Sequence, residues 1–257
     1  MNDNQMSVVE HLSELRKRLI WIISGFVVAL IFGFLVAGPV VEHIKNDPIA
    51  VNIEDWYVFG LSDALRIYMQ VAFVIALAFT LPLILYHIWR FVSPGLMEEE
   101  RKAIAAYIPF SFLLLIIGLL FGYYFLFPLI IGFLSGFSQM LGASETYGLT
   151  QYFQFLFNLI LPISLLFELP IIILFLTSIR VVNPPLLIKF RKYAMLLSVI
   201  VAAMITPPDF ISNIVVTIPI IILYEISIIL SKRIYRKQLA RQARYEEEFA
   251  TIRTDDD

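Results

Sequence analysis

The chain has 257 residues, of which 60% are hydrophobic and only 16% are charged. This composition, with a mean hydropathy of +0.83, excludes a water-soluble globular protein. The absence of cysteine excludes disulfides, thiolate metal sites and a cysteine nucleophile. A net charge of −2 argues against a general nucleic-acid-binding protein, because such a protein needs a basic surface facing the phosphates.

Long uncharged runs predict an all-α polytopic membrane protein with six transmembrane helices. A helix needs about 20 mostly apolar residues to cross the hydrocarbon core of a bilayer. The six predicted spans cover residues 19–38, 67–89, 103–131, 152–179, 193–206 and 210–231. The fifth of these would reach only about 21 Å at 1.5 Å per residue. We therefore predict a short last hairpin formed by helices five and six.

Prolines inside or near the spans predict kinked helices, because each proline removes a backbone donor from its helix. Kinked helices do not pack as a straight bundle, so we expect a concave assembly. The connection over residues 39–66 is long enough to form a structured outer loop. No soluble domain is predicted: residues 1–257 form a single membrane domain that ends in a charged tail at 232–257.

The distribution of basic residues predicts the orientation of the chain. Of the 19 Lys and Arg residues, 17 lie in the N-terminal segment, in the connections over 90–102 and 180–192, and in the tail. Only Lys45 and Arg66 lie in the alternate connections. Because cytoplasmic loops are enriched in Lys and Arg, both termini are expected to be cytoplasmic.

Two acidic residues stand out within or between the last three spans. Glu168 lies inside the fourth span, where an isolated carboxylate costs about 3 kcal/mol on insertion scales. It is either a protonated carboxyl bonded within the helix bundle or a polar site that a partner helix or substrate meets. Asp209 follows two prolines at an outer turn, where it is expected to cap the next helix.

The cytoplasmic side carries carboxylates as well as cations. Glu14 precedes Arg18 by four residues, a spacing that allows an ordinary ion pair along one helix face. Glu98, Glu99 and Glu100 lie in a connection that should be basic, which indicates a cationic ligand. No hydrolase or nucleotide-binding motif is present and the three histidines lie far apart, so neither an enzyme, a cofactor nor a metal site is predicted.

Several short motifs, in a shared order over nearly the whole chain, resemble the TatC family of the twin-arginine protein translocase. They are His11-Leu12-x-Glu14-Leu15-Arg16-x-Arg18, Pro82, Phe91-x-x-Pro94-x-Leu96 with Glu100-Arg101, Phe127-Pro128, Phe167-Glu168-x-Pro170 and Thr206-Pro207-Pro208-Asp209. The resemblance implies a non-enzymatic receptor for the twin-arginine signal peptides of folded proteins. Such a receptor works with single-span TatA-type partners in a multimeric complex and uses the proton-motive force; whether a separate TatB-type subunit takes part stays open.

By position, Glu14 and Glu100 resemble the family's carboxylates that receive the arginine pair of the signal. Glu168 resembles its intramembrane acidic residue on a partly hydrated concave face, where a partner's helix would bind. Which of Glu98, Glu99 and Glu100 contacts the arginines stays open. The expected location is the inner or plasma membrane of a prokaryote. The alternatives are a proton- or ion-coupled secondary transporter with Glu168 as its protonation site, and a scaffold for other membrane proteins.

Overall fold

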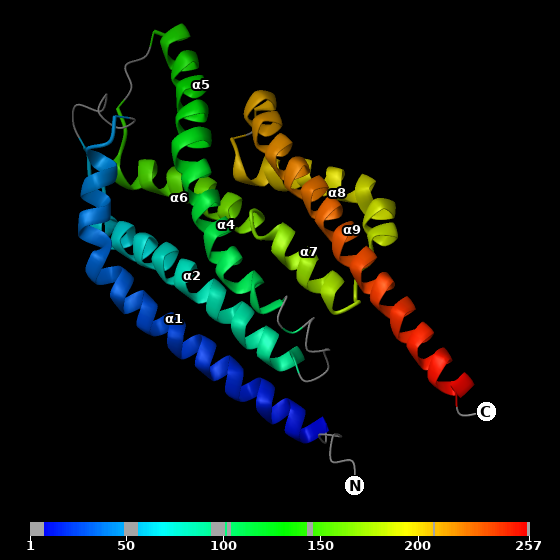
Figure 1. The fold of residues 1–257 in the computed structure, drawn as a ribbon. Coiled ribbons are helices and arrows are strands. Elements are labelled where there is room, and N and C mark those ends of the chain that lie inside the picture. Colours follow the sequence, from blue (N-terminus) through cyan, green and yellow to red (C-terminus); the bar gives the residue numbers. More distant parts are fainter. Residues whose placement is uncertain are drawn as a thin grey trace. The chain divides into compact units, whose positions relative to one another are not determined.

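The computed structural model describes residues 8–48, 56–93, 101, 104–142, 146–207 and 209–255, which are mostly helical. Figure 1 shows the helices in chain order. They are α1 (Val8–Lys45), α2 (Asp63–Val92), α4 (Tyr107–Phe121), the π-helical turn η2 (Gly122–Leu126), α5 (Phe127–Met140), α6 (Leu149–Leu166), α7 (Leu169–Ser178), α8 (Pro184–Ile205) and α9 (Phe210–Asp255). The described residues contain one isolated β-bridge, between Tyr57 and Gly148, and are otherwise all-α.

Five helical segments are long and apolar enough to cross a membrane, and α8 is a sixth long helix. The five segments are Ser13–Lys45, Asp63–Val92, Tyr107–Met140, Leu149–Ser178 and Phe210–Arg244. They contain the predicted spans one, two and six and most of spans three and four. The chain is a multi-pass membrane protein.

Helix α8 differs from the prediction, because it begins at Pro184 rather than at Tyr193. Its 22 residues correspond to about 33 Å of helix, and the short apolar span predicted over 193–206 is the C-terminal part of this helix. The apolar run is interrupted by Lys189, Arg191 and Lys192, but cations do not interrupt the backbone hydrogen bonds of a helix. Asn183 caps the N-terminus of α8, because its side chain accepts a 2.9 Å hydrogen bond from the N–H of Leu186.

Two of the predicted irregularities occur at prolines. The π-helical turn η2 ends directly before Phe127 and Pro128, and Pro128 has no N–H to continue the α-helical pattern. Helices α6 and α7 are separated by Phe167 and Glu168, and Pro170 occupies the first turn of α7. The concave form of the whole assembly stays a prediction.

Residues 1–165 form one of two compact units, and α1 packs against α2 within it. The helices approach closely at Gly33, where a Cβ atom would lie 2.7 Å from the carbonyl oxygen of Ala72. Aromatic contacts line the same interface, with ring centroids 5.8 Å apart between Phe26 and Phe73. This tight packing fixes α1 against α2, the two helices on which the candidate site is built.

The structured outer loop is confirmed in its described part. Trp56 packs edge-on against Tyr152 at 5.1 Å, and the N–H of Leu149 donates to the carbonyl of Tyr57 at 2.8 Å. Asp63 accepts a hydrogen bond of 2.9 Å from the N–H of Gly60 at the start of α2. These contacts tie the end of the loop to both α2 and α6.

Residues 166–257 form the second unit, in which α9 packs against α7 and α8. Its hydrophobic core contains Ile173, Leu187 and Ile228. A buried hydrogen bond of 2.8 Å joins the hydroxyl groups of Thr177 and Ser231. The charged tail continues α9 as one helix to Asp255.

Candidate functional site

The first candidate residue, Glu14, lies near the start of α1 and forms an ion pair with Arg18. The pair joins Nη2 of Arg18 to Oε1 of Glu14 across one turn of the helix. The side chains are 12% exposed for Arg18 and 29% exposed for Glu14. The carboxylate is therefore accessible from outside, whereas the guanidinium is mostly enclosed.

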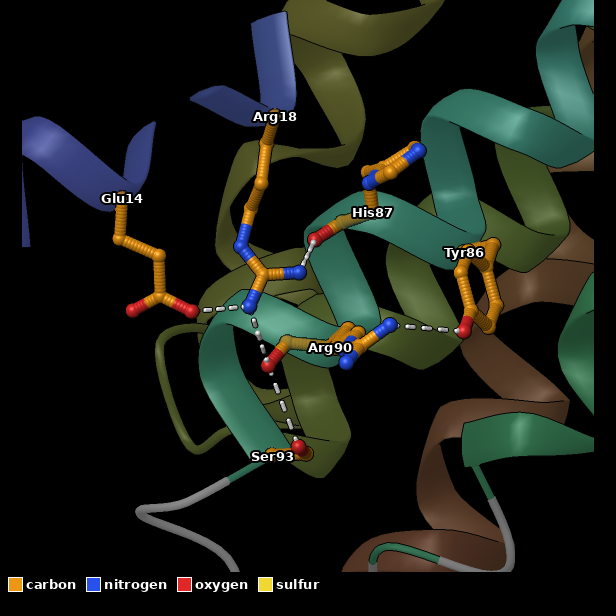
Figure 2. A network of polar contacts seen from close by, with 6 residues as sticks. All are labelled: Glu14, Arg18, Tyr86, His87, Arg90 and Ser93. Carbon is orange, nitrogen blue, oxygen red and sulfur yellow. Dashed lines mark hydrogen bonds and ion pairs between the residues drawn. The ribbon is translucent and has the colours of Figure 1, made fainter. Parts of the chain in front are cut away.

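Arg18 also connects α1 to the last turn of α2. Its Nη1 donates to the carbonyl of His87 at 3.4 Å, and its Nη2 donates to the carbonyl of Arg90 at 3.3 Å (Figure 2). The carbonyls at a helix C-terminus carry partial negative charge, so a guanidinium is stabilised there. The carbonyl of Arg90 accepts a further hydrogen bond from Oγ of Ser93 at 3.2 Å. Arg18 thus holds Glu14 beside the end of α2.

The second candidate, Glu100, lies outside the described residues together with Glu98 and Glu99. The next residue in the chain, Arg101, is described and contacts Trp89 near the end of α2. The indole Nε1 of Trp89 donates to the carbonyl of Arg101 at 3.0 Å, and the guanidinium lies 5.8 Å from the ring centroid. The residue that follows Glu100 is therefore anchored on the same end of α2 that Arg18 contacts.

An apolar cavity of about 690 Å³ lies between α1 and α2, beside this network. It is lined by Trp21, Ser24, Gly25, Val28, Ala29, Phe32, Phe79, Leu83 and His87. His87 thus belongs to both features: its carbonyl accepts from Arg18 and its side chain lines the cavity. The arrangement places a carboxylate next to an apolar surface, which suits a ligand with a cationic and an apolar part.

Glu168 lies between α6 and α7, directly before the first residue of α7. Its carbonyl accepts a 3.0 Å hydrogen bond from the N–H of Ile172, and the dipole of α7 favours a negative charge at this end. The residue is only 3% exposed. That Glu168 faces a concave, partly hydrated surface stays a prediction. A carboxyl that is enclosed by protein avoids the cost of exposure to lipid.

Asp209 lies directly before α9 and has the geometry of a helix cap. Its Oδ1 accepts a 2.6 Å hydrogen bond from the N–H of Ser212, three residues along. Sequence reasoning did not find the ion pair of 2.7 Å that joins Arg191 on α8 to Glu225 on α9. The two residues are 34 positions apart, and no local spacing signals such a contact.

The structure brings some candidate residues together and leaves others apart. Glu14 and the end of α2 belong to the first compact unit, whereas Glu168 and Asp209 belong to the second. Among the side chains that the structure describes, no three His, Asp or Glu residues gather as a metal site would require. Glu14 is the candidate whose surroundings show most directly how it could bind a ligand.

Comparison with known proteins identifies the family. The family model described as Sec-independent protein translocase protein (TatC) matches residues 10–219. The chain is 46% identical to the Sec-independent protein translocase protein TatCy of Bacillus subtilis, over 92% of this chain and 93% of that protein. It is 44% identical to the TatC protein of Halalkalibacterium halodurans, over 96% of this chain and 99% of that protein.

A solved structure has the same fold. It is a crystal structure of the twin arginine translocase receptor TatC, with a TM-score of 0.74 and 33% sequence identity. The match covers 88% of this chain and 99% of the solved chain. Agreement in sequence and in fold over most of both chains leads to one conclusion: this chain belongs to the TatC family.

Proposed function

We propose that this chain is the receptor component of a Sec-independent protein translocase and that Glu14 and Glu100 bind the arginine pair of a signal peptide. The observation that carries the proposal is the position of Glu14. It is a partly exposed carboxylate held beside the end of α2, from which the chain continues to Glu100. A solved relative is named a twin arginine translocase receptor, which supports the same assignment.

The apolar cavity between α1 and α2 supports the proposal independently of the charges. Exposed ion pairs contribute only about 0.2–1 kcal/mol each, so two arginines alone would bind weakly. The cavity is lined by Trp21, one turn beyond Arg18, and offers an apolar surface next to the carboxylate. We place the apolar stretch of the signal peptide along it, where burial adds about 25 cal/mol for each Å² removed from water.

The first test compares two synthetic signal peptides, one with its arginine pair and one with two lysines instead. We expect the full-length chain in detergent to bind the arginine peptide about tenfold more tightly, because a guanidinium donates two parallel hydrogen bonds to a carboxylate. An ammonium group acts as a point charge. Fluorescence anisotropy of labelled peptides measures both affinities. Equal affinities for the two peptides would contradict the proposal.

The proposed receptor has both termini in the cytoplasm of a prokaryotic cell, because 17 of its 19 basic residues lie on one side of the predicted spans. The chain lacks cysteine, so single cysteines can be labelled selectively. We expect Thr146→Cys to react with an impermeant maleimide from outside the cell and Gln242→Cys to react only after permeabilisation. Both residues are exposed in the chain. The reverse pattern would invert the proposed orientation.

The same proposal includes single-span TatA-type and TatB-type partners in a multimeric complex driven by the proton-motive force. Glu168 is the residue proposed to meet a partner's transmembrane helix. Because the residue is enclosed in the isolated chain, contact with a partner requires a local rearrangement around the break between α6 and α7. The alternative of a small-solute transporter loses its support, since the relatives with the same fold are protein translocase components.

A further inference from the structure

We propose that Arg18 is an internal competitor of the signal peptide, because it occupies the Glu14 carboxylate in the peptide-free chain. This inference rests on the proposed function of Glu14. The guanidinium of Arg18 is the same chemical group that the signal peptide would bring. Binding would then be an exchange of one guanidinium for another on the same carboxylate, and Arg18 sets the affinity that a peptide must exceed.

The geometry of the ion pair shows that it can be replaced. A single nitrogen of Arg18, Nη2, contacts a single oxygen of Glu14, Oε1. The Nε of Arg18 is buried and has no hydrogen-bond partner among the described residues. The contact is therefore not the two-bond fork that an arginine and a carboxylate form at best. A peptide arginine that approaches the exposed side of Glu14 can form that fork and so displace the weaker internal contact.

Arg18 also has other acceptors to remain on after it releases Glu14. Its Nη1 and Nη2 donate to the carbonyls of His87 and Arg90, which lie in the last turns of α2. A positive charge is favourable at this helix end without Glu14. The released guanidinium therefore stays partly satisfied, which lowers the cost of the exchange.

The replacement of Arg18 by glutamine should leave no buried acceptor without a donor. The carbonyl of Arg90 keeps the hydroxyl of Ser93 as a donor at 3.2 Å. The carbonyl of His87 lies inside α2, where the helix itself supplies a backbone donor. The Glu14 side chain is 29% exposed, so its charge remains solvated. The variant is expected to fold and to present Glu14 unoccupied.

The experiment measures the affinity of the full-length chain for a fluorescent synthetic peptide with an arginine pair followed by an apolar stretch. We expect Arg18→Gln to bind this peptide about two- to fivefold more tightly than the wild type, as the loss of a competing ion pair implies. Competition for one carboxylate reduces the affinity of every ligand by the same factor. The lysine-pair peptide should therefore gain by the same factor.

Two further variants test whether the gain in affinity comes from freeing the Glu14 carboxylate or from the general loss of a positive charge. Lys17→Gln removes one exposed positive charge from the neighbouring position and should change the affinity by less than half as much as Arg18→Gln. In a Glu14→Gln background, Arg18→Gln should produce no gain, because the shared carboxylate is gone. A gain that persists in this background, or an equal gain in Lys17→Gln, would show a general charge effect and overturn the inference.

If Arg18 has a positioning role instead, the change in peptide affinity has the opposite sign. If Arg18 serves to hold Glu14 in place for the peptide, Arg18→Gln will weaken binding, and the inference fails. Should Arg18→Gln not fold, Arg18→Lys keeps the charge but cannot bridge Glu14 and both carbonyls, and it too must bind the peptide more tightly. A different result would contradict the proposed function itself: Glu14→Gln would bind the arginine peptide as well as the wild type does.

Discussion

The double substitution Glu14→Gln and Glu100→Gln is expected to weaken binding of a twin-arginine peptide by about 100-fold. A hydrogen bond to a charged group contributes about 1.5–3 kcal/mol, and 1.4 kcal/mol corresponds to a tenfold change in affinity. Each single variant should therefore lose about tenfold, since the amide keeps one acceptor oxygen but not the charge. Titration of the labelled peptide against each variant in detergent measures the losses.

A matched control comes from the other end of α1. Glu42 is an exposed carboxylate on the same helix, and Glu42→Gln removes the same charge far from the end of α2. This variant should bind the peptide as the wild type does. If the double variant also keeps wild-type affinity, the assignment is wrong. If only Glu14→Gln has an effect, the partner carboxylate is to be sought at Glu98 or Glu99.

The second large effect is expected at Glu168, where alanine and glutamine should differ. Glu168→Ala removes all hydrogen-bonding capacity from a site that is 3% exposed, so we expect export and crosslinking to a TatA-type partner to fall at least tenfold. Glu168→Gln keeps a donor and an acceptor and should preserve much of both activities. Peptide binding should remain unchanged in either variant, because Glu14 lies in the other compact unit.

The outcome distinguishes a partner site from a proton-coupling site. A residue that must titrate fails equally as alanine and as glutamine, since neither side chain ionises. Equal loss of export in both variants with intact partner crosslinks would therefore favour proton coupling over partner binding. Glu225→Gln serves as the control for an intramembrane carboxylate, because Glu225 is already engaged by Arg191 at 2.7 Å. It should leave the crosslinks intact.

Local features of this protein were predictable from the sequence. The positions of the long helices follow from uncharged runs of sufficient length, because hydropathy acts along the chain. The contact between Glu14 and Arg18 follows from the spacing of four residues in a helix, and the hydrogen bond from Ser212 to Asp209 follows from a polar residue before a helix start. Each of these depends on residues within one turn of one another.

Hydropathy did not predict the first half of α8, where charged side chains lie on a continuous helical backbone. The beginning of α8 at Pro184 was missed because cations at Lys189 and Arg191 ended the apolar pattern. Helix formation depends on backbone hydrogen bonds and on a cap such as Asn183, and neither is affected by an exposed charge. The sequence therefore identified the apolar half of this helix and missed its polar half.

Only the tertiary structure decided the contacts between helices. Arg18 reaches carbonyls 69 and 72 residues away, and the hydroxyls of Thr177 and Ser231 meet across 54 residues. Helical periodicity shows which residues share a face, but it does not show which face of another helix will lie opposite. The burial of Glu168 is likewise a result of tertiary packing, since it depends on every segment that packs around the residue. The sequence alone thus determined the helices and the local pair of Glu14 and Arg18, while packing decided that Arg18 also reaches the carbonyls at the end of α2.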